Sequence, residues 1–121
     1  MSFPAERPRR LRRGQRLRAM VRETRLLPEQ LVYPLFVVPG SAKRREIPSL
    51  PGCSHLSPDE AAKEAREVES LGIGGVILFG LPEAKDPLGT HGYREDGVVQ
   101  QAVREIRQEC RDLVVMTDVC L

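Results

Sequence analysis

Several features that mark other protein classes are scarce in this sequence. The 121 residues contain no tryptophan, and aromatic side chains make up only 4% of them. No stretch approaches the roughly 18 consecutive apolar residues of a membrane-spanning helix, so we expect no membrane segment. Three cysteines, Cys53, Cys110 and Cys120, are widely spaced and form no Cys-x-x-Cys pair. This number and spacing argue against a disulfide framework and favour reduced thiols.

Common catalytic and nucleotide-binding motifs are missing as well. The sequence has no Walker-type phosphate loop, no HExxH and no Gly-x-Ser-x-Gly. Its glycine-rich segment, residues 72–75, follows an expected helix and precedes an expected strand, which is the reverse of a dinucleotide-binding loop. His55 and His91 lie far apart in polar segments, and each is expected to be a surface residue rather than a metal ligand.

The overall composition is that of a globular domain. Hydrophobic residues make up 40% of the chain and charged residues 30%, which is typical of a soluble folded protein. The arginine-rich start has no apolar core and cleavage site of the kind found in secretory signals, and Glu6 and Glu23 within it argue against a transit peptide. We therefore expect a cytoplasmic protein.

Charge is distributed unevenly along the chain. Residues 1–25 carry nine arginines and two glutamates, a balance of +7, whereas the remainder carries ten basic and fifteen acidic side chains, a balance of −5. A basic arm on an acidic body suggests contact with nucleic acid, with an anionic surface or with the body of a neighbouring copy. Phe3 is the only aromatic residue of the arm, so few side chains are available for stacking on nucleic-acid bases. Contact between copies of the chain is therefore favoured.

Two regions follow from the pattern of apolar residues. In the arm and its helix, residues 1–26, Pro4 and Pro8 discourage helix at the start, and the later apolar spacing predicts a short amphipathic helix over 15–26. The body, residues 27–121, is expected to contain three buried strands and two helices. The strands are predicted at 31–38, 75–79 and 113–116, and the helices begin after Ser57 and Asp96.

Local signals refine these elements. Ser57, Pro58 and Glu60 form an expected N-cap, first-turn proline and capping box, and Gly72 is a plausible helix C-cap. Pro34 removes one hydrogen-bond donor, so the first strand should have an unpaired or irregular point near its start.

The order strand, helix, strand, helix, strand predicts parallel strands joined by right-handed crossovers. Both strand-to-helix connections are long, about seventeen residues, and both helix-to-strand connections are short, about three. The long loops leave the carboxyl ends of the strands, where barrels and doubly wound sheets both carry their chemistry. The pattern of elements is equally compatible with a barrel and with a doubly wound sheet.

The end of the third strand carries candidate site residues. Asp118 and Cys120 are two apart, so in an extended chain they share one face. A carboxylate and a soft thiolate there could bind a metal, and zinc is the metal they favour. Spacing alone nevertheless favours a buried cysteine beside a capping aspartate.

Eight segments of the sequence, taken in order, resemble the porphobilinogen synthase (5-aminolevulinate dehydratase) family. Each segment is a weak signal, but the eight occur in order with compatible spacing, and the match runs over essentially the whole chain. A methionine is usual in the family where Leu50 stands, and an arginine near His55. The segments are RPRRLR (7–12), MVRET (20–24), YPLFV (33–37), IPSLPG (47–52), LGI (71–73), LFG (78–80), KD (85–86) and TDVCL (117–121).

The resemblance implies a fold and an assembly. The expected fold is α/β, the N-terminal part of a TIM (β/α)8 barrel with about three strands, preceded by an extended N-terminal arm. The arm is expected to wrap a neighbouring subunit, usually in a homo-octamer. Since three strands cannot close an eight-stranded barrel, we expect the chain to be the first portion of a longer protein, ending at the third strand.

The resemblance also implies an activity, the joining of two 5-aminolevulinate molecules into porphobilinogen with loss of two waters, in tetrapyrrole and heme biosynthesis. Asp118 matches an active-site carboxylate, and Phe79 an aromatic residue at the rim of the second strand. Cys120 matches the first of three cysteines that hold zinc in zinc-type members, the other two lying beyond Leu121. An allosteric magnesium ion is a further expectation.

The family's two Schiff-base lysines belong to later strands. Lys43, Lys63 and Lys85 do not match them, so the 121 residues alone are expected to be inactive. No nucleic acid or membrane partner is expected. The alternative, from a different class, is a small doubly wound α/β binding module whose basic arm contacts an acidic partner.

Overall fold

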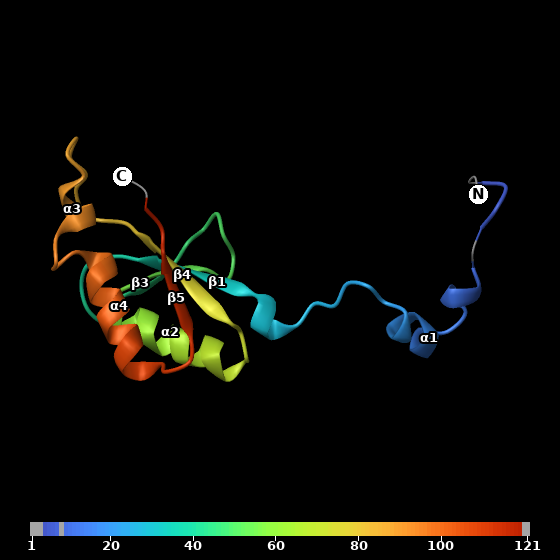
Figure 1. Ribbon diagram of the computed structural model, residues 1–121. Coiled ribbons are helices and arrows are strands. Elements are labelled where there is room, and N and C mark those ends of the chain that lie inside the picture. Colours follow the sequence, from blue (N-terminus) through green and yellow to red (C-terminus); the bar gives the residue numbers. More distant parts are fainter. Residues whose placement is uncertain (1–3, 8, 120–121) are drawn as a thin grey trace.

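The computed structural model describes residues 4–7 and 9–119, and it separates an extended arm from a compact α/β body (Figure 1). The arm contains the 3-10 helix η1 (Arg10–Arg12) and the helix α1 (Gln15–Met20). Within the described residues up to 31, every side chain is exposed except that of Leu17, which is partly buried. The helix expected over 15–26 is therefore shorter than predicted, because a helix of this length needs a packing partner that the arm does not have here.

The body is built on a five-stranded sheet in the order β2-β3-β1-β4-β5. The three expected strands are present as β1 (Val32–Val37), β4 (Gly75–Gly80) and β5 (Val114–Thr117). They lie side by side and parallel, in the order in which they occur in the chain. A short 3-10 helix, η2 (Pro28–Gln30), leads from the arm into β1.

The segment between β1 and the first long helix was expected to be a polar loop, and this was wrong. It forms a hairpin of β2 (Arg44–Glu46) and β3 (Ser54–Leu56), and β3 adds to β1 in parallel, with Phe36 opposite His55. Three-residue strands with mostly polar side chains carry too little apolar alternation to be found from the sequence.

Pro34 is a register partner of Ile77 in β4, but on the side of β1 that faces the hairpin it lies before the first pair with β3. The amide of Val38 donates to Leu56 of β3, whereas the carbonyl of Val37 accepts from Leu81, beyond the end of β4. Successive residues of a strand form their hydrogen bonds on opposite sides, so Pro34 faces the same side as Val38. The hairpin does not reach that far along β1, and the missing N–H of the proline therefore leaves no broken bond.

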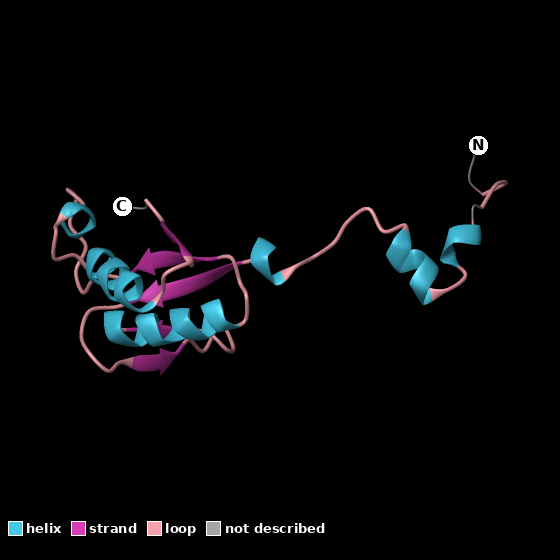
Figure 2. Ribbon diagram, turned by 60° about the horizontal axis from the view of Figure 1, so that its bottom comes forward, coloured by secondary structure: helices cyan, strands magenta, loops and turns pink. Residues whose placement is uncertain are grey.

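Two long helices, α2 (Pro58–Ser70) and α4 (Val98–Glu109), pack against each other and against one face of the sheet (Figure 2). Alternate strand residues point into this core, and small residues on the helices allow close approach. The buried set includes Leu35, Val37, Val76, Leu78, Ala61, Ala65, Val68, Ala102 and Ile106. No helix in the described part of the chain is long and apolar enough to cross a membrane.

The opposite face of the sheet is not covered by either of these helices. Val32 and Val114, which point to this face, remain 48% and 56% exposed. A doubly wound sheet carries helices on both faces, whereas a barrel carries them only outside and fills its interior with the other side chains. The arrangement therefore favours the barrel.

The ends of the helices differ in detail from the expectations. Ser57 occupies the N-cap position of α2, but its hydroxyl accepts from the amide of Lys43 (2.9 Å) and donates to Asp59 (2.6 Å) instead of capping the helix. At the other end Gly72, with φ of +78°, closes the helix as expected, since the amides of Gly72 and Ile73 bond back to Glu69 and Val68. The N-cap of α4 is Gly97 and not Asp96.

Candidate active site

Phe36, Phe79 and Asp118 lie in a row across the carboxyl ends of three neighbouring strands. Phe36 and Phe79 are register partners in the β1–β4 pair. Leu78 is the register partner of Thr117, so the next residues, Phe79 and Asp118, are neighbours as well. All three side chains project from the face of the sheet that the helices leave open, because they alternate with the buried core residues.

The two phenylalanine rings are in contact. Their centroids are 5.5 Å apart and their planes differ by 23°, which is a stacked arrangement. Both residues are partly exposed, and Asp118 beside them is exposed. The row thus presents an apolar surface that ends in a carboxylate.

A cleft of about 510 Å³ opens over this row, a size that suits a small-molecule ligand. The strand ends form one wall, and the loop 81–97 with the first turns of α4 forms the other. Gly80 brings the two walls together, since a side chain there would collide with Val99 of α4. The lining includes Phe36, Phe79, Lys85, Asp86, His91, Gln100, Thr117 and Asp118.

The loop 81–97 is ordered by bonds from side chains to its backbone. Asp86 accepts from the amides of Leu88 (2.9 Å) and Thr90 (3.1 Å), and hydrogen bonding from Thr90 holds the pKa of this carboxyl below its usual value. Gln100 of α4 donates to the carbonyl of Gly92 (2.9 Å). The loop also contains the short helix α3 (Thr90–Tyr93), which the sequence did not indicate.

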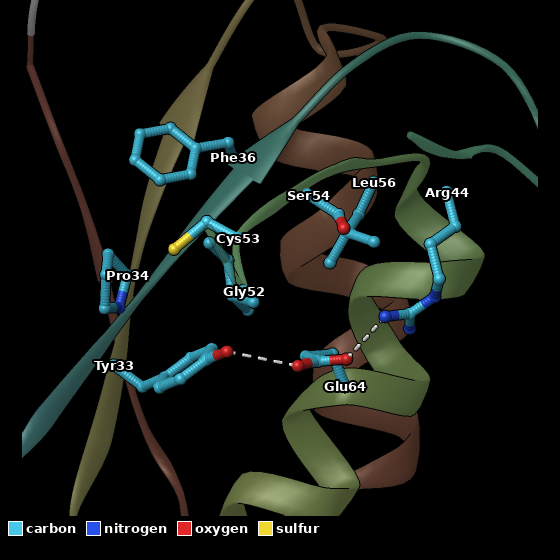
Figure 3. A pocket seen from close by; sticks show the side chains of 10 residues that line it. Tyr33, Pro34, Phe36, Arg44, Gly52, Cys53, Ser54, Leu56 and Glu64 are labelled. Atoms are coloured by element: carbon cyan, nitrogen blue, oxygen red, sulfur yellow. Dashed lines mark hydrogen bonds and ion pairs between the residues drawn. The ribbon is translucent and has the colours of Figure 1, made fainter. Parts of the chain in front are cut away.

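A second pocket lies beneath the β2–β3 hairpin, and it is too small for a substrate (Figure 3). Its volume of about 20 Å³ would hold one water molecule. Tyr33 donates to Glu64 (3.2 Å), which also accepts from Arg44 (2.9 Å), so the pocket joins β1, the hairpin and α2. Burial, and then the charge of Glu64, raise the pKa of Tyr33. This network is structural.

Of the three lysines expected to be non-catalytic, Lys43 and Lys63 lie outside the cleft lining, whereas Lys85 is part of it. Lys63 forms an ion pair with Glu60 at 2.5 Å on the surface of α2, and this bond raises the pKa of the lysine. A lysine that forms a Schiff base needs a lowered pKa instead. Lys43 donates to the carbonyl of Pro39 (2.9 Å), away from the cleft lining.

The structure brings together two of the three site residues predicted from the sequence, Phe79 and Asp118. The third, Cys120, lies outside the described residues, and so do the second and third cysteines that the resemblance implies beyond the chain end. Within residues 4–7 and 9–119, no three histidine, cysteine or acidic side chains are grouped to hold a metal ion. Cys53 and Cys110 are free thiols, as expected.

Phe36 was not identified from the sequence as a site residue. Its position could have been found, because it precedes the last residue of β1 as Phe79 precedes the last residue of β4. Residues at equivalent places in parallel strands meet at the same edge of the sheet. What the sequence did not provide was the register that sets the two rings against each other.

The chain is similar in sequence to proteins of one known family. The family model described as delta-aminolevulinic acid dehydratase matches residues 5–121. The delta-aminolevulinic acid dehydratase of Synechocystis is 49% identical over 119 residues, 98% of this chain and 36% of its own length. That of Bacillus subtilis is 45% identical over 121 residues, 100% of this chain and 37% of its own length. The chain therefore spans about a third of the length of these relatives.

A solved structure of the same family has a similar fold. The delta-aminolevulinic acid dehydratase of Toxoplasma gondii, determined in complex with the reaction product porphobilinogen, superposes with a TM-score of 0.86 and 34% identity. The superposition covers 94% of this chain and 33% of that one. The predicted fold, the first part of a TIM barrel behind an extended arm, is confirmed. This chain belongs to the delta-aminolevulinic acid dehydratase family.

Proposed function

We propose that the chain forms the first three barrel strands of a porphobilinogen synthase, which condenses two 5-aminolevulinate molecules into porphobilinogen and releases two waters. The observation that carries this proposal is the position of Phe79 and Asp118, side by side over an open cleft at the carboxyl ends of the strands. The catalytic groups of TIM-barrel enzymes lie at this end. No feature of the described residues favours the alternative, a small binding module.

The two side chains suit different parts of 5-aminolevulinate. The carboxylate of Asp118 can accept a hydrogen bond from the substrate's amino group and relay a proton. The ring of Phe79 offers an apolar wall to the methylene groups between the ketone and the carboxylate. Covalent attachment of the ketone would be left to the lysines that the resemblance assigns to later strands, so the 121 residues alone should not turn over substrate.

Zinc is part of the proposal, with Cys120 as one of its ligands. The described residues contain no complete donor set, and a zinc site needs three or four protein ligands. A thiolate two residues beyond Asp118 is a soft donor that favours zinc. When bound, zinc would supply Lewis-acid polarisation of a substrate carbonyl. No described residue is assigned to the allosteric magnesium ion.

Assembly through the arm is also proposed, with a homo-octamer as the expected form and a cytoplasmic location. The arm has seven more positive than negative charges over residues 1–25, and it exposes large apolar side chains. Met20 and Leu26 are 78% and 76% exposed. A neighbouring copy with an acidic body would bury these side chains and neutralise the charge.

A hybrid protein tests the proposed activity. The 121 residues replace the matched N-terminal part of the Bacillus subtilis relative, which supplies the rest of the barrel. We expect the hybrid to form porphobilinogen from 5-aminolevulinate, and the 121-residue chain alone to form none. The unaltered relative is the positive control. A hybrid that assembles like the relative but is inactive would contradict the proposal.

A further inference from the structure

We propose that Phe36 is a positioning residue of this site: its ring holds the ring of Phe79 in place against the cleft, and it thereby sets how tightly the substrate binds. This inference rests on the proposed function and adds a residue to it. Phe36 acts through Phe79 in this proposal, without being part of the reacting machinery.

The rings of Phe36 and Phe79 stack directly on each other. Their centroids are 5.5 Å apart with planes 23° from parallel. The residues are register partners on adjacent strands, so the backbone hydrogen bonds of the sheet hold the rings at this separation. Stacked pairs at such distances are favoured beyond the apolar area they bury.

Among the described residues, the ring of Phe79 stacks on one aromatic side chain, that of Phe36. The helices pack on the opposite face of the sheet, against Val76 and Leu78. On the open face the next residue in the row is Asp118, an exposed side chain that is shorter than a ring. Without Phe36, the ring of Phe79 could occupy several rotamers. Phe36 is therefore the described side chain that limits the rotation of Phe79 from the β1 side.

The consequence for a substrate follows from the kind of contact. The ring meets methylene groups that do not react, so its contribution is nearly equal for the bound substrate and for the transition state. Loss of such uniform binding raises KM and leaves kcat nearly unchanged. A ring that must be reordered on each binding event has this effect.

The test is a double-mutant cycle in the active hybrid, with Phe36→Leu, Phe79→Leu and the double variant. Phe36→Leu should raise KM by about two- to tenfold, the range expected for one stacked pair, with a smaller change in kcat. In the Phe79→Leu background the same change should have almost no effect, because the ring it positions is gone. The unmodified hybrid, measured first, tests the proposed function by itself.

Controls separate positioning from general stability. Phe36→Tyr keeps the ring and should keep KM. If Phe36→Leu assembles poorly, Phe36→Met takes its place in the cycle, because it keeps a similar volume without the ring, and it should raise KM in the same way. Val32→Ala lies on the same face of β1, at its other end, and should leave KM unchanged. Equal effects of Phe36→Leu in both backgrounds, or an unchanged KM, would overturn the proposal.

Discussion

The amide of Asp118 donates a 3.1 Å hydrogen bond to the carbonyl of Leu78. This bond continues the β4–β5 ladder by one residue beyond the last strand pair and keeps Asp118 next to Phe79. The carboxylate is thus placed by backbone geometry at the edge of the cleft, while its own side chain stays exposed. A group positioned in this way can be replaced without disturbing the sheet, which makes it a good subject for mutation.

Asp118→Asn in the hybrid should reduce turnover by about 100-fold or more, the usual range for loss of a general acid or base. The reason is that the amide cannot take up a proton. The measurement is porphobilinogen formation together with bound zinc, which should stay constant. Asp112→Asn, which changes an exposed aspartate two residues before the start of the same strand, should leave both unchanged. Full activity in Asp118→Asn would remove the residue from the mechanism.

Cys120→Ala in the hybrid should remove most of the bound zinc and most of the activity, while the protein stays folded. The physical reason is the loss of one of the few ligands of a zinc site. Metal content by elemental analysis and secondary structure by circular dichroism are the two readouts. Cys53→Ala, which alters a partly buried thiol outside the cleft, is the matched control. Normal zinc in Cys120→Ala would show that the metal assignment is wrong.

The 121-residue chain expressed alone should self-associate or be poorly stable. In the described part of the chain, neither α2 nor α4 covers the second face of the sheet, and β5 is an edge strand in which Val114 is 56% exposed. Open edges and apolar faces promote association. Sedimentation velocity over a range of concentrations measures this. A monodisperse monomer with a sharp cooperative melt would contradict the expectation.

Deletion of residues 1–13 from the hybrid should shift the assembly to smaller species, with activity falling as a consequence. The +7 charge of the arm also makes the intact assembly sensitive to salt, because ions screen exposed charges at a separation of about 8 Å at physiological ionic strength. Sedimentation before and after deletion, at low and high salt, is the measurement. An unchanged oligomer would argue against a role of the arm in assembly.

Ser57→Ala should destabilise the hybrid by about 1–3 kcal/mol, because removal of the buried hydroxyl leaves the amide of Lys43 without its hydrogen-bond acceptor. The change should also alter the response to acid. Hydrogen bonds from Ser57 and from the amide of Ala42 lower the pKa of Asp59. The stability that Asp59 contributes is therefore present above the pKa of its unfolded form and is lost as the pH falls through the lower, folded value.

Urea unfolding at pH 7 and at pH 3 measures both effects. The unmodified hybrid should lose more stability between the two pH values than Ser57→Ala does, because part of the Asp59 contribution is already absent in the variant. Ser70→Ala, in which an exposed hydroxyl bonded to Glu67 is removed, is the control. The same acid response in all three proteins would contradict this assignment.

The sequence by itself determined the elements whose signals are local. The apolar runs of β1, β4 and β5, the proline at the start of α2 and the glycine at its end all depend on neighbouring residues, and each was predicted close to its place. Phe79 and Asp118 were predicted as site residues because their segments resemble those of a known family. In contrast, the polar hairpin β2–β3 and the one-turn helix α3 have no periodic apolar pattern, and they were missed.

The tertiary structure alone decided how these elements meet. The pattern of alternating strands and helices suits a barrel and a doubly wound sheet equally, and the choice came from both helices packing on one face. Register set Phe36 against Phe79 and Asp118 beside them, because backbone hydrogen bonds between strands depend on residues more than 35 positions apart. The hydroxyl of Ser57 likewise accepts from the amide of Lys43 instead of capping α2, and Lys43 is 14 positions away in the sequence. Contacts between distant residues form only on folding, and no local pattern in the chain encodes them.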